Sequence, residues 1–324
     1  MIQFGPGTWI SISYPHTFMV LNKLILRLRQ TLSLLSLTLL GLMFAACGDD
    51  NPGWSALGDG NGIYPSTSIT ARMETPRTLS DGSTVVLSHD VTINGHKVVT
   101  YALEYDKAKY HSRWVAFRFD GDTRGRTVGR SDEPFADDPS LSSSLHIGSN
   151  GFSREYNRGH LCASADRLYN RDANVQTFYM SNMSPQLASF NQAYWITLEN
   201  LVQKLGRDAS FSDTLYVVKG GTIRNDQILE YVTRSNGKQV VVPKYYYMAL
   251  LKVKNGVYSS IAFWMEHKEY GYDYQHQAPL SEIRKTVVSV NELEQNTGID
   301  FFPNLPDAAE ESIESQKVAS AWGM

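Results

Sequence analysis

The pattern of apolar and polar positions predicts a protein built mainly from strands. Residues 98–105 and 113–119 largely alternate in character and are rich in Val, Tyr, Trp and Phe, as half-buried strands are. Four further segments have strand character, at residues 214–219, 240–242, 245–253 and 258–263. Because the connections between the last three are short, we expect those segments to form an antiparallel run.

Helical patterns are fewer. Residues 192–205 carry apolar side chains at helical spacing, at Trp195, Leu198, Val202 and Leu205, and Gly206 is expected to end this helix. Ser289 and Glu292 have the spacing of a capping box, which predicts a short helix that ends before Gly298. Runs of strands with few helices favour an α+β fold with a mixed, largely antiparallel sheet over a doubly wound parallel sheet.

The first 46 residues have the pattern of an export signal. Three basic residues precede a charge-free run from residue 30 to residue 46, and they are Lys23, Arg27 and Arg29. The run is too short for a membrane span, which needs roughly 20 apolar residues. Met19 lies just ahead of the basic residues and is a candidate for the true start of the chain.

The end of this signal, Phe44-Ala45-Ala46-Cys47, resembles that of a bacterial lipoprotein. The resemblance implies that Cys47 carries lipid and holds the exported protein on a membrane, at the periplasmic or cell-surface face. Phe44 stands where such signals usually have Leu, and ordinary secretion with cleavage near Ala46 is the alternative. Residues 47–70 are rich in Gly, Asp, Asn, Ser and Pro, and we expect them to form a flexible tether.

Length and composition fit one large globular domain with extensions, since 42% of the 324 residues are hydrophobic and 19% are charged. We expect this domain at residues 71–306, followed by an acidic surface tail at residues 307–324. Loss of residues 1–46 removes three basic residues and no acidic ones, so the formal charge changes from −3 to −6. Proteins that bind nucleic acid by broad phosphate neutralisation are usually basic. A nucleic-acid substrate here would require a local arginine cluster and a metal, and the alternative is that the protein binds its substrate weakly.

Candidate chemistry gathers in the segment NRGHLCASADR, residues 157–167. His160 follows Arg158 and Gly159, and an imidazole with a pKa near neutrality can accept a proton from water. Glycine permits a tight turn and a close approach of the backbone. A lone histidine is more often structural or exposed, so the functional interpretation depends on a second cluster.

That second cluster extends from Ser181 to Glu199. Eight residues separate Asn191 from Glu199, which on a helix is about 80° beyond two full turns, so both lie on one side. Amide and carboxylate oxygens suit Mg²⁺, which keeps several waters and few protein ligands. The alternatives are that Asn191 caps the helix and that Glu199 lies on a solvated face.

Together the two clusters resemble the DNA/RNA non-specific endonuclease family, the ββα-metal or His-Me finger nucleases. The family motif is DRGH followed by small residues, and this chain reads NRGHLCASADR. Downstream the family has N-x-x-P-Q, then Asn-Gln, Trp and Glu, and this chain reads NMSPQLASFNQAYWITLEN. The resemblance continues through LYVVKGGTI, VPKYYYMALL and NELEQNTGIDFFPNLP, so it covers about residues 95–306. It implies an α+β fold whose active site is a ββα-metal finger.

The resemblance implies a role for each matching residue. His160 is the expected general base, and Asn191 is the expected ligand of one Mg²⁺, for which Mn²⁺ or another divalent cation can substitute. Glu199 is expected to complete the metal site and to organise metal-bound water, and Asn182 to support the site. The implied reaction is hydrolysis of DNA or RNA phosphodiesters to 5′-phosphate ends.

Three arginines are candidates for the substrate. Arg158 matches the motif arginine near the scissile phosphate, and Arg130 matches a phosphate-binding arginine. Asp166 and Arg167 are expected to form a structural ion pair, with direct substrate contact by Arg167 as the alternative. Contacts to backbone phosphates carry little sequence information, so we expect little sequence preference.

The chain departs from the family pattern at two positions. Asn157 replaces the motif Asp, which keeps hydrogen bonding but loses a charge, and Ala163 stands where relatives often have Pro. Cys162, near the expected base, is interpreted as a small buried hydrophobe rather than a nucleophile. The alternatives to an active enzyme are a weakened nucleic-acid-binding surface lipoprotein of nuclease ancestry and a surface interaction protein with a vestigial site. The sequence leaves the oligomeric state open.

Overall fold

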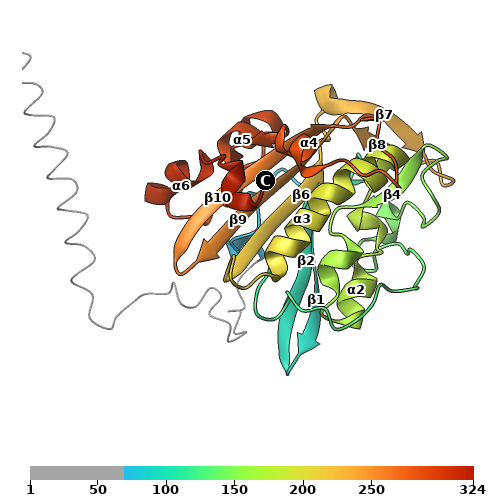
Figure 1. Ribbon diagram of the computed structural model, residues 1–324. Helices are drawn as coiled ribbons and strands as arrows, with labels where there is room; N and C mark the ends of the chain where they lie inside the picture. Colours follow the sequence, from blue (N-terminus) through green and yellow to red (C-terminus); the bar gives the residue numbers. More distant parts are fainter. Residues whose placement is uncertain (1–68) are drawn as a thin grey trace, which may run out of the picture. The chain divides into compact units, whose positions relative to one another are not determined.

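A seven-stranded sheet forms the centre of the computed structural model, which describes residues 69–324 (Figure 1). Every neighbouring pair of strands in the sheet is antiparallel. In sheet order the strands are β1 (Thr84–Ile93), β2 (His96–Asp106), β3 (His111–Phe119), β6 (Thr214–Gly221), β9 (Tyr245–Lys254), β10 (Val257–Glu266) and β11 (Val287–Val288). The expected α+β class with a largely antiparallel sheet is confirmed.

One predicted strand lies elsewhere. Residues 240–242 belong to β8 (Gln239–Pro243), which pairs with β7 (Ile228–Thr233) in a separate two-stranded sheet. The strands β9 and β10 pair directly through a tight connection, with Lys254 opposite Val257. The antiparallel run expected for β8, β9 and β10 therefore holds for β9 and β10 only, because β8 pairs with β7.

A second small sheet leads into the longest helix. β4 (Tyr156–His160) pairs antiparallel with β5 (Met183–Leu187), and β5 is followed by η6 (Phe190–Trp195) and α3 (Ile196–Arg207). η6 is a π-helical turn, a widened turn that is frequent at functional sites. The predicted single helix at residues 192–205 is thus a π turn joined to an α-helix. The order β4, β5, α3 forms the expected ββα unit.

Both faces of the central sheet are covered. One core joins α3, through Leu198, Leu201, Val202 and Leu205, to side chains such as Phe117 and Val217. The other face packs against α5 (Val290–Thr297) and α6 (Asp307–Glu314), with Leu293 and Ile313 in the second core. Two shorter α-helices also lie within residues 69–324, α2 (Arg171–Gln176) and α4 (Leu280–Arg284). Inward-facing apolar residues on both faces fix α3 and its polar side firmly on the sheet.

Two predicted helix ends have different outcomes. The capping box of α5 is present: Ser289 Oγ accepts from the Glu292 backbone N–H at 3.1 Å, and Gly298 follows in the left-handed region at φ 69°. Gly206, in contrast, does not end its helix, because α3 continues to Arg207. A Cβ at Gly206 would overlap the ring of Phe119, so this glycine permits a close approach of helix and sheet.

The predicted surface tail is wrong, because the chain after Pro306 is packed. It forms α6 and the short turn η8 (Ala319–Trp322). Ile313 is buried in the second core, and Trp322, only 1% exposed, lies in the first core. The segment has few apolar residues, but its short helices place these residues on the inner side. A count of apolar residues does not detect that placement.

Several expectations fall outside the described residues. These are the export signal at residues 1–46, lipidation of Cys47, and the tether at residues 47–70 except for its last two residues. Those two residues begin η2 (Ile69–Ala71). Within residues 69–324, no helix combines the length and the apolar character that crossing a membrane requires.

Candidate active site

The β4–β5 ribbon carries the NRGH motif. Asn157 is paired with Gln186, and His160 is paired with Met183. Between them, a Cβ at Gly159 would overlap the buried side chain of Gln186, so only glycine leaves room for this packing. The close contact between Gly159 and Gln186 sets how the two strands lie and therefore where His160 points.

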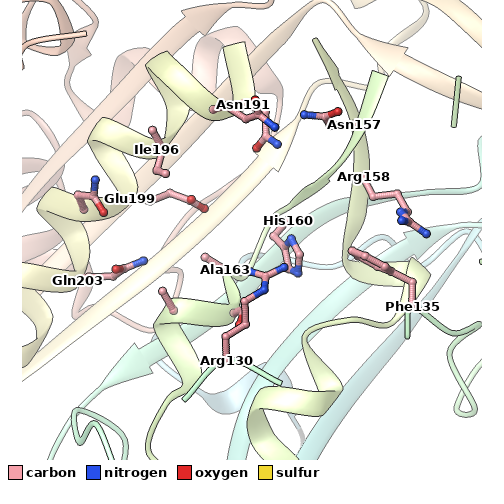
Figure 2. Close-up of a pocket in the computed structure, with 14 residues that line it drawn as sticks. Arg130, Phe135, Asn157, Arg158, His160, Ala163, Asn191, Ile196, Glu199 and Gln203 are labelled. Atoms are coloured by element: carbon pink, nitrogen blue, oxygen red, sulfur yellow. The ribbon is translucent and has the colours of Figure 1, made fainter. Parts of the chain in front are cut away.

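His160 faces α3 across a pocket of about 390 Å³ (Figure 2). The ribbon contributes Asn157, Arg158 and His160, and the π turn with α3 contributes the opposite wall. That wall consists of Asn191, Gln192, Ile196, Glu199, Asn200 and Gln203. The pocket therefore brings together the two clusters of the sequence, with His160 and Asn191 31 positions apart along the chain.

The electrostatic surroundings of His160 keep its ring neutral. Burial, followed by the positive charges of Arg130, Lys219 and Arg158, lowers the pKa of His160 to about 3. Its Nε2 is buried and has no hydrogen-bond partner among the described residues. The ring contacts Phe178 edge to face, with centroids 5.3 Å apart. A neutral imidazole with an unpartnered nitrogen can accept a proton, and a bound phosphate would offset the surrounding positive charge.

The π turn and α3 place Asn191 and Glu199 in the same pocket. Asn191 lies inside η6, whose N-cap is Ser189, so it is not the helix cap. Glu199 is only 9% exposed and accepts a hydrogen bond from Trp195 Nε1 at 3.1 Å, so it is not on a solvated face. Burial raises the pKa of Glu199, against the lowering effect of Lys219. Both alternative interpretations of these residues are therefore excluded.

Two of the three predicted substrate arginines line the pocket, Arg130 and Arg158. The Arg158 guanidinium lies 3.7 Å from the ring centroid of Phe135 and donates to the Ser149 carbonyl at 2.6 Å. Arg130 is exposed and lies 4.9 Å from the ring centroid of Phe178. Both guanidinium groups are thus held over aromatic rings. Figure 2 shows Arg158 beside Phe135, and both arginines line the pocket, where each can meet a phosphate.

Arg167 and its expected ion pair are corrected by the structure. Arg167 is completely buried, stacks on Phe117 and Phe119, and donates to the carbonyls of Thr100 and Arg118. A side chain so enclosed by the sheet cannot contact a substrate. Asp166 pairs instead with Lys219, with Nζ and Oδ2 2.8 Å apart.

Asn182 supports the site from beneath and is not in contact with the pocket. It is fully buried; its Oδ1 accepts from the Cys162 N–H at 2.8 Å, and its Nδ2 donates to the Cys162 carbonyl at 2.9 Å. These bonds fix the chain just after His160. Asn182 therefore supports the site as a positioning residue, through the backbone of Cys162 and without contact with the pocket.

Cys162 has the properties of a core residue. Its side chain is completely buried, and burial raises the pKa of the thiol to about 12. A protonated, enclosed thiol is a poor nucleophile. The interpretation of Cys162 as a small hydrophobe agrees with these surroundings.

Sequence reasoning missed Lys219 and Gln203. Lys219 lies in the centre of the sheet, on β6, and its ammonium contacts both Asp166 and Glu199. Its signal was a lysine directly after the apolar run LYVV and directly before Gly220-Gly221, within a predicted strand. Gln203 lines the pocket one helical turn after Glu199, and the spacing of four residues would have placed it on the same face.

The donor set fits a hard divalent cation. The pocket offers an amide oxygen from Asn191 and a carboxylate from Glu199, and Mg²⁺ binds such oxygens while keeping several waters. Within residues 69–324, no group of three or more His, Cys, Asp or Glu side chains is arranged to hold a metal. Asn191 and Glu199 would be the protein ligands of such a cation.

The fold and site define a protein with a ββα finger on an antiparallel sheet. The family model described as "DNA/RNA non-specific endonuclease" matches residues 82–308, and the chain belongs to this family. The region of resemblance expected from the motifs was about residues 95–306, so the match begins earlier, at residue 82, and ends close to the expected place, at residue 308.

Individual relatives agree with this assignment. The mouse protein "Nuclease EXOG, mitochondrial" is 29% identical over 224 residues, which cover 64% of this chain and 57% of the relative. A protein of Nostoc sp. named "Nuclease" is 30% identical over 224 residues, with 67% of this chain and 76% of the relative covered. The chain thus spans under two thirds of the length of the mouse relative.

A solved structure supports the fold. The crystal structure of the EndoG/EndoGI complex contains a chain that aligns with a TM-score of 0.52 and 23% sequence identity. The alignment covers 68% of this chain and 88% of the other. At this identity the likeness concerns the fold, which is that of the ββα-metal nucleases.

Proposed function

We propose that this protein is a metal-dependent endonuclease that hydrolyses DNA or RNA phosphodiesters with little sequence preference. One observation carries the proposal: His160, Asn191 and Glu199 line a single pocket, and the buried Nε2 of His160 has no hydrogen-bond partner among the described residues. Family membership supports the reaction class. The substrate, the metal and the end chemistry are parts of the proposal.

His160 accepts a proton from a water, and the oxygen of that water attacks phosphorus in line. The bond from phosphorus to the 3′ oxygen breaks. The leaving oxygen takes up a proton from solvent, so one product ends in a 3′-hydroxyl and the other in a 5′-phosphate. Arg130 and Arg158 bind the phosphate oxygens from the pocket wall, and Glu199 orders the waters in the pocket. A cation held by Asn191 and Glu199, with Mg²⁺ first and Mn²⁺ as a substitute, would neutralise phosphate charge and stabilise the leaving oxygen.

The test is nicking of supercoiled plasmid by the purified protein, with Mg²⁺ and with EDTA. We expect nicking with Mg²⁺ alone, and we expect His160→Ala to be slower by at least 100-fold, since general-base catalysis contributes about 10²–10⁴. His276→Ala is the matched control, because His276 is exposed and paired with Asp273 outside the pocket. Absence of nicking with every divalent metal would contradict the proposal.

Binding without cleavage is the second candidate, and Asn157 is the observation that favours it. Asn157 lines the pocket in place of the motif aspartate, so a carboxylate is missing beside His160. Wild-type protein that binds a DNA fragment but does not nick plasmid, together with an Asn157→Asp variant that does, would establish a weakened nuclease.

For the location of the protein, we propose an exported, lipid-anchored form, supported by the sequence pattern that ends at Cys47. Cys47→Ser should move the protein from the membrane fraction to the soluble fraction. Unchanged partitioning would count against lipidation.

A further inference from the structure

A charged side chain lies at the centre of the main sheet, directly behind the pocket. Lys219 is the sixth residue of β6, is fully buried, and has Phe117 beside it with the ammonium 5.2 Å from the ring centroid. Burying an ammonium group is costly unless carboxylates and hydrogen bonds compensate. The carboxylates that compensate the charge of Lys219 therefore indicate its role.

One partner of Lys219 is Glu199. The Lys219 ammonium lies 3.5 Å from Glu199 Oε1, the same oxygen that accepts from Trp195 Nε1. Among the described residues, no hydrogen bond reaches the second oxygen, Oε2. Two donors thus hold one oxygen of the carboxylate and leave the other for the pocket that Glu199 lines.

The other partner is Asp166, which connects Lys219 to the histidine segment. Asp166 Oδ2 lies 2.8 Å from the ammonium and also accepts from the Ala163 N–H at 2.9 Å. Ala163 is three residues after His160 and lines the pocket. The ion pair therefore links β6, α3 and the segment that follows β4.

We propose that Lys219, held by Asp166, is a positioning residue that fixes the Glu199 carboxylate for the divalent cation. The inference rests on the metal site of the proposed function. Hydrogen-bond partners of metal-site carboxylates orient them, and loss of such a partner typically lowers metal affinity by about 10–100-fold. The ion pair thus places Glu199 in a pocket whose other cation ligand, Asn191, comes from the preceding π turn.

The test compares Mn²⁺ binding by calorimetry, without nucleic acid, in full-length wild type and variants. Lys219→Met removes the ammonium and keeps a side chain of similar length. Because this change leaves Asp166 as an unpaired buried carboxylate, the double variant Lys219→Met/Asp166→Asn removes both charges together. Lys252→Met is the matched control, since Lys252 is a half-buried sheet lysine packed over Phe211.

We expect the Kd for Mn²⁺ to rise at least tenfold in the Lys219 variants. Their affinity for plasmid in EDTA should stay within twofold of wild type. The Kd of Lys252→Met for Mn²⁺ should also stay within twofold of wild type. A folded Lys219 variant that binds Mn²⁺ like wild type overturns the inference, as does a wild type that binds no Mn²⁺. Failure of both variants to fold also overturns it, because the pair is then required by the fold itself. A wild type that shows the expected difference but nicks no plasmid refutes the nuclease activity and still supports the positioning role.

Discussion

Close packing and hydrogen bonds restrict the position of single side chains in this site. Gly159 leaves space for Gln186, Asn182 fixes the backbone of Cys162, and two donors hold one oxygen of Glu199. His160, in contrast, has an unpartnered buried nitrogen. Rigid neighbours and one unsatisfied acceptor are the arrangement expected of a general base that waits for a water.

Gly159→Ala tests this packing. The added methyl group would overlap Gln186, so β4 must shift and move His160 with it. We expect a fall in nicking rate of at least tenfold and a loss of about 1–3 kcal/mol in the free energy of unfolding, as for other overpacked sites. The control is Gly151→Ala, where the methyl group meets open space. Wild-type activity in Gly159→Ala would show that this contact does not position the base.

Among the elements, α6 shows how a polar segment can still be part of a core. It contributes Ile313 to the core behind the sheet and buries Glu314, whose Oε1 has no hydrogen-bond partner among the described residues. Burial, followed by the negative charges of Glu294 and Glu310, raises the pKa of Glu314 to about 9. The carboxyl group is therefore protonated in the folded protein at neutral pH.

Glu314→Gln should raise the free energy of unfolding at pH 8 relative to wild type. The folded-state pKa lies above the unfolded value of about 4.3, so the folded state loses stability relative to the unfolded state as pH rises from about 4.3 to 9. Glutamine does not ionise, so we expect the variant to match wild type near pH 4.5 and to exceed it by at least about 1.4 kcal/mol at pH 8. Urea unfolding at both pH values measures this. The control is Glu311→Gln, at an exposed position on the same helix. If Glu314→Gln and wild type differed in unfolding free energy by the same amount at both pH values, the raised pKa of Glu314 would be contradicted.

At the scale of the whole molecule, buried acids and buried histidines have opposite effects on pH dependence. Burial lowers the pKa of His111 and the pKa of His267 to about 4. Burial raises the pKa of the Glu294 and Glu314 carboxyl groups. His267 accepts from the Leu187 N–H at 2.8 Å and contacts the Pro243 carbonyl, so it ties the ribbon to the rest of the fold as a neutral ring. The opposing groups partly cancel in the stability of wild type.

The variant His267→Gln isolates the contribution of His267 to the pH dependence of stability. The folded-state pKa of His267 lies below its unfolded value of about 6.5, so its stabilisation is full above pH 6.5 and is lost as pH falls towards 4. The difference in unfolding free energy between wild type and His267→Gln should therefore shrink by up to about 1.4 kcal/mol per pH unit between pH 6.5 and 4. Denaturant unfolding at several pH values measures it. A constant difference over this range would mean that His267 is not held neutral.

Short-range patterns in the sequence were enough to find the residues of the candidate site. The motif around His160 and the spacing of Asn191 and Glu199 predicted which residues share the pocket. Alternation in two segments and strand character in others predicted most strands of the central sheet. The limits appeared where a residue depends on distant partners. Periodicity placed a helix at residues 192–205, but the π turn within it and the role of Gly206 against Phe119 depend on packing.

By itself, the sequence determined the family, the α+β class and the set His160, Asn191 and Glu199, because these follow from motifs and local spacing. Only the tertiary structure decided that Arg167 is enclosed by the sheet, that the tail packs into both cores, and that Lys219 lies behind Glu199. Lys219 meets Asp166 across 53 residues and Glu199 across 20. Burial and ion pairing of this kind arise from contacts between distant segments, which no local pattern specifies.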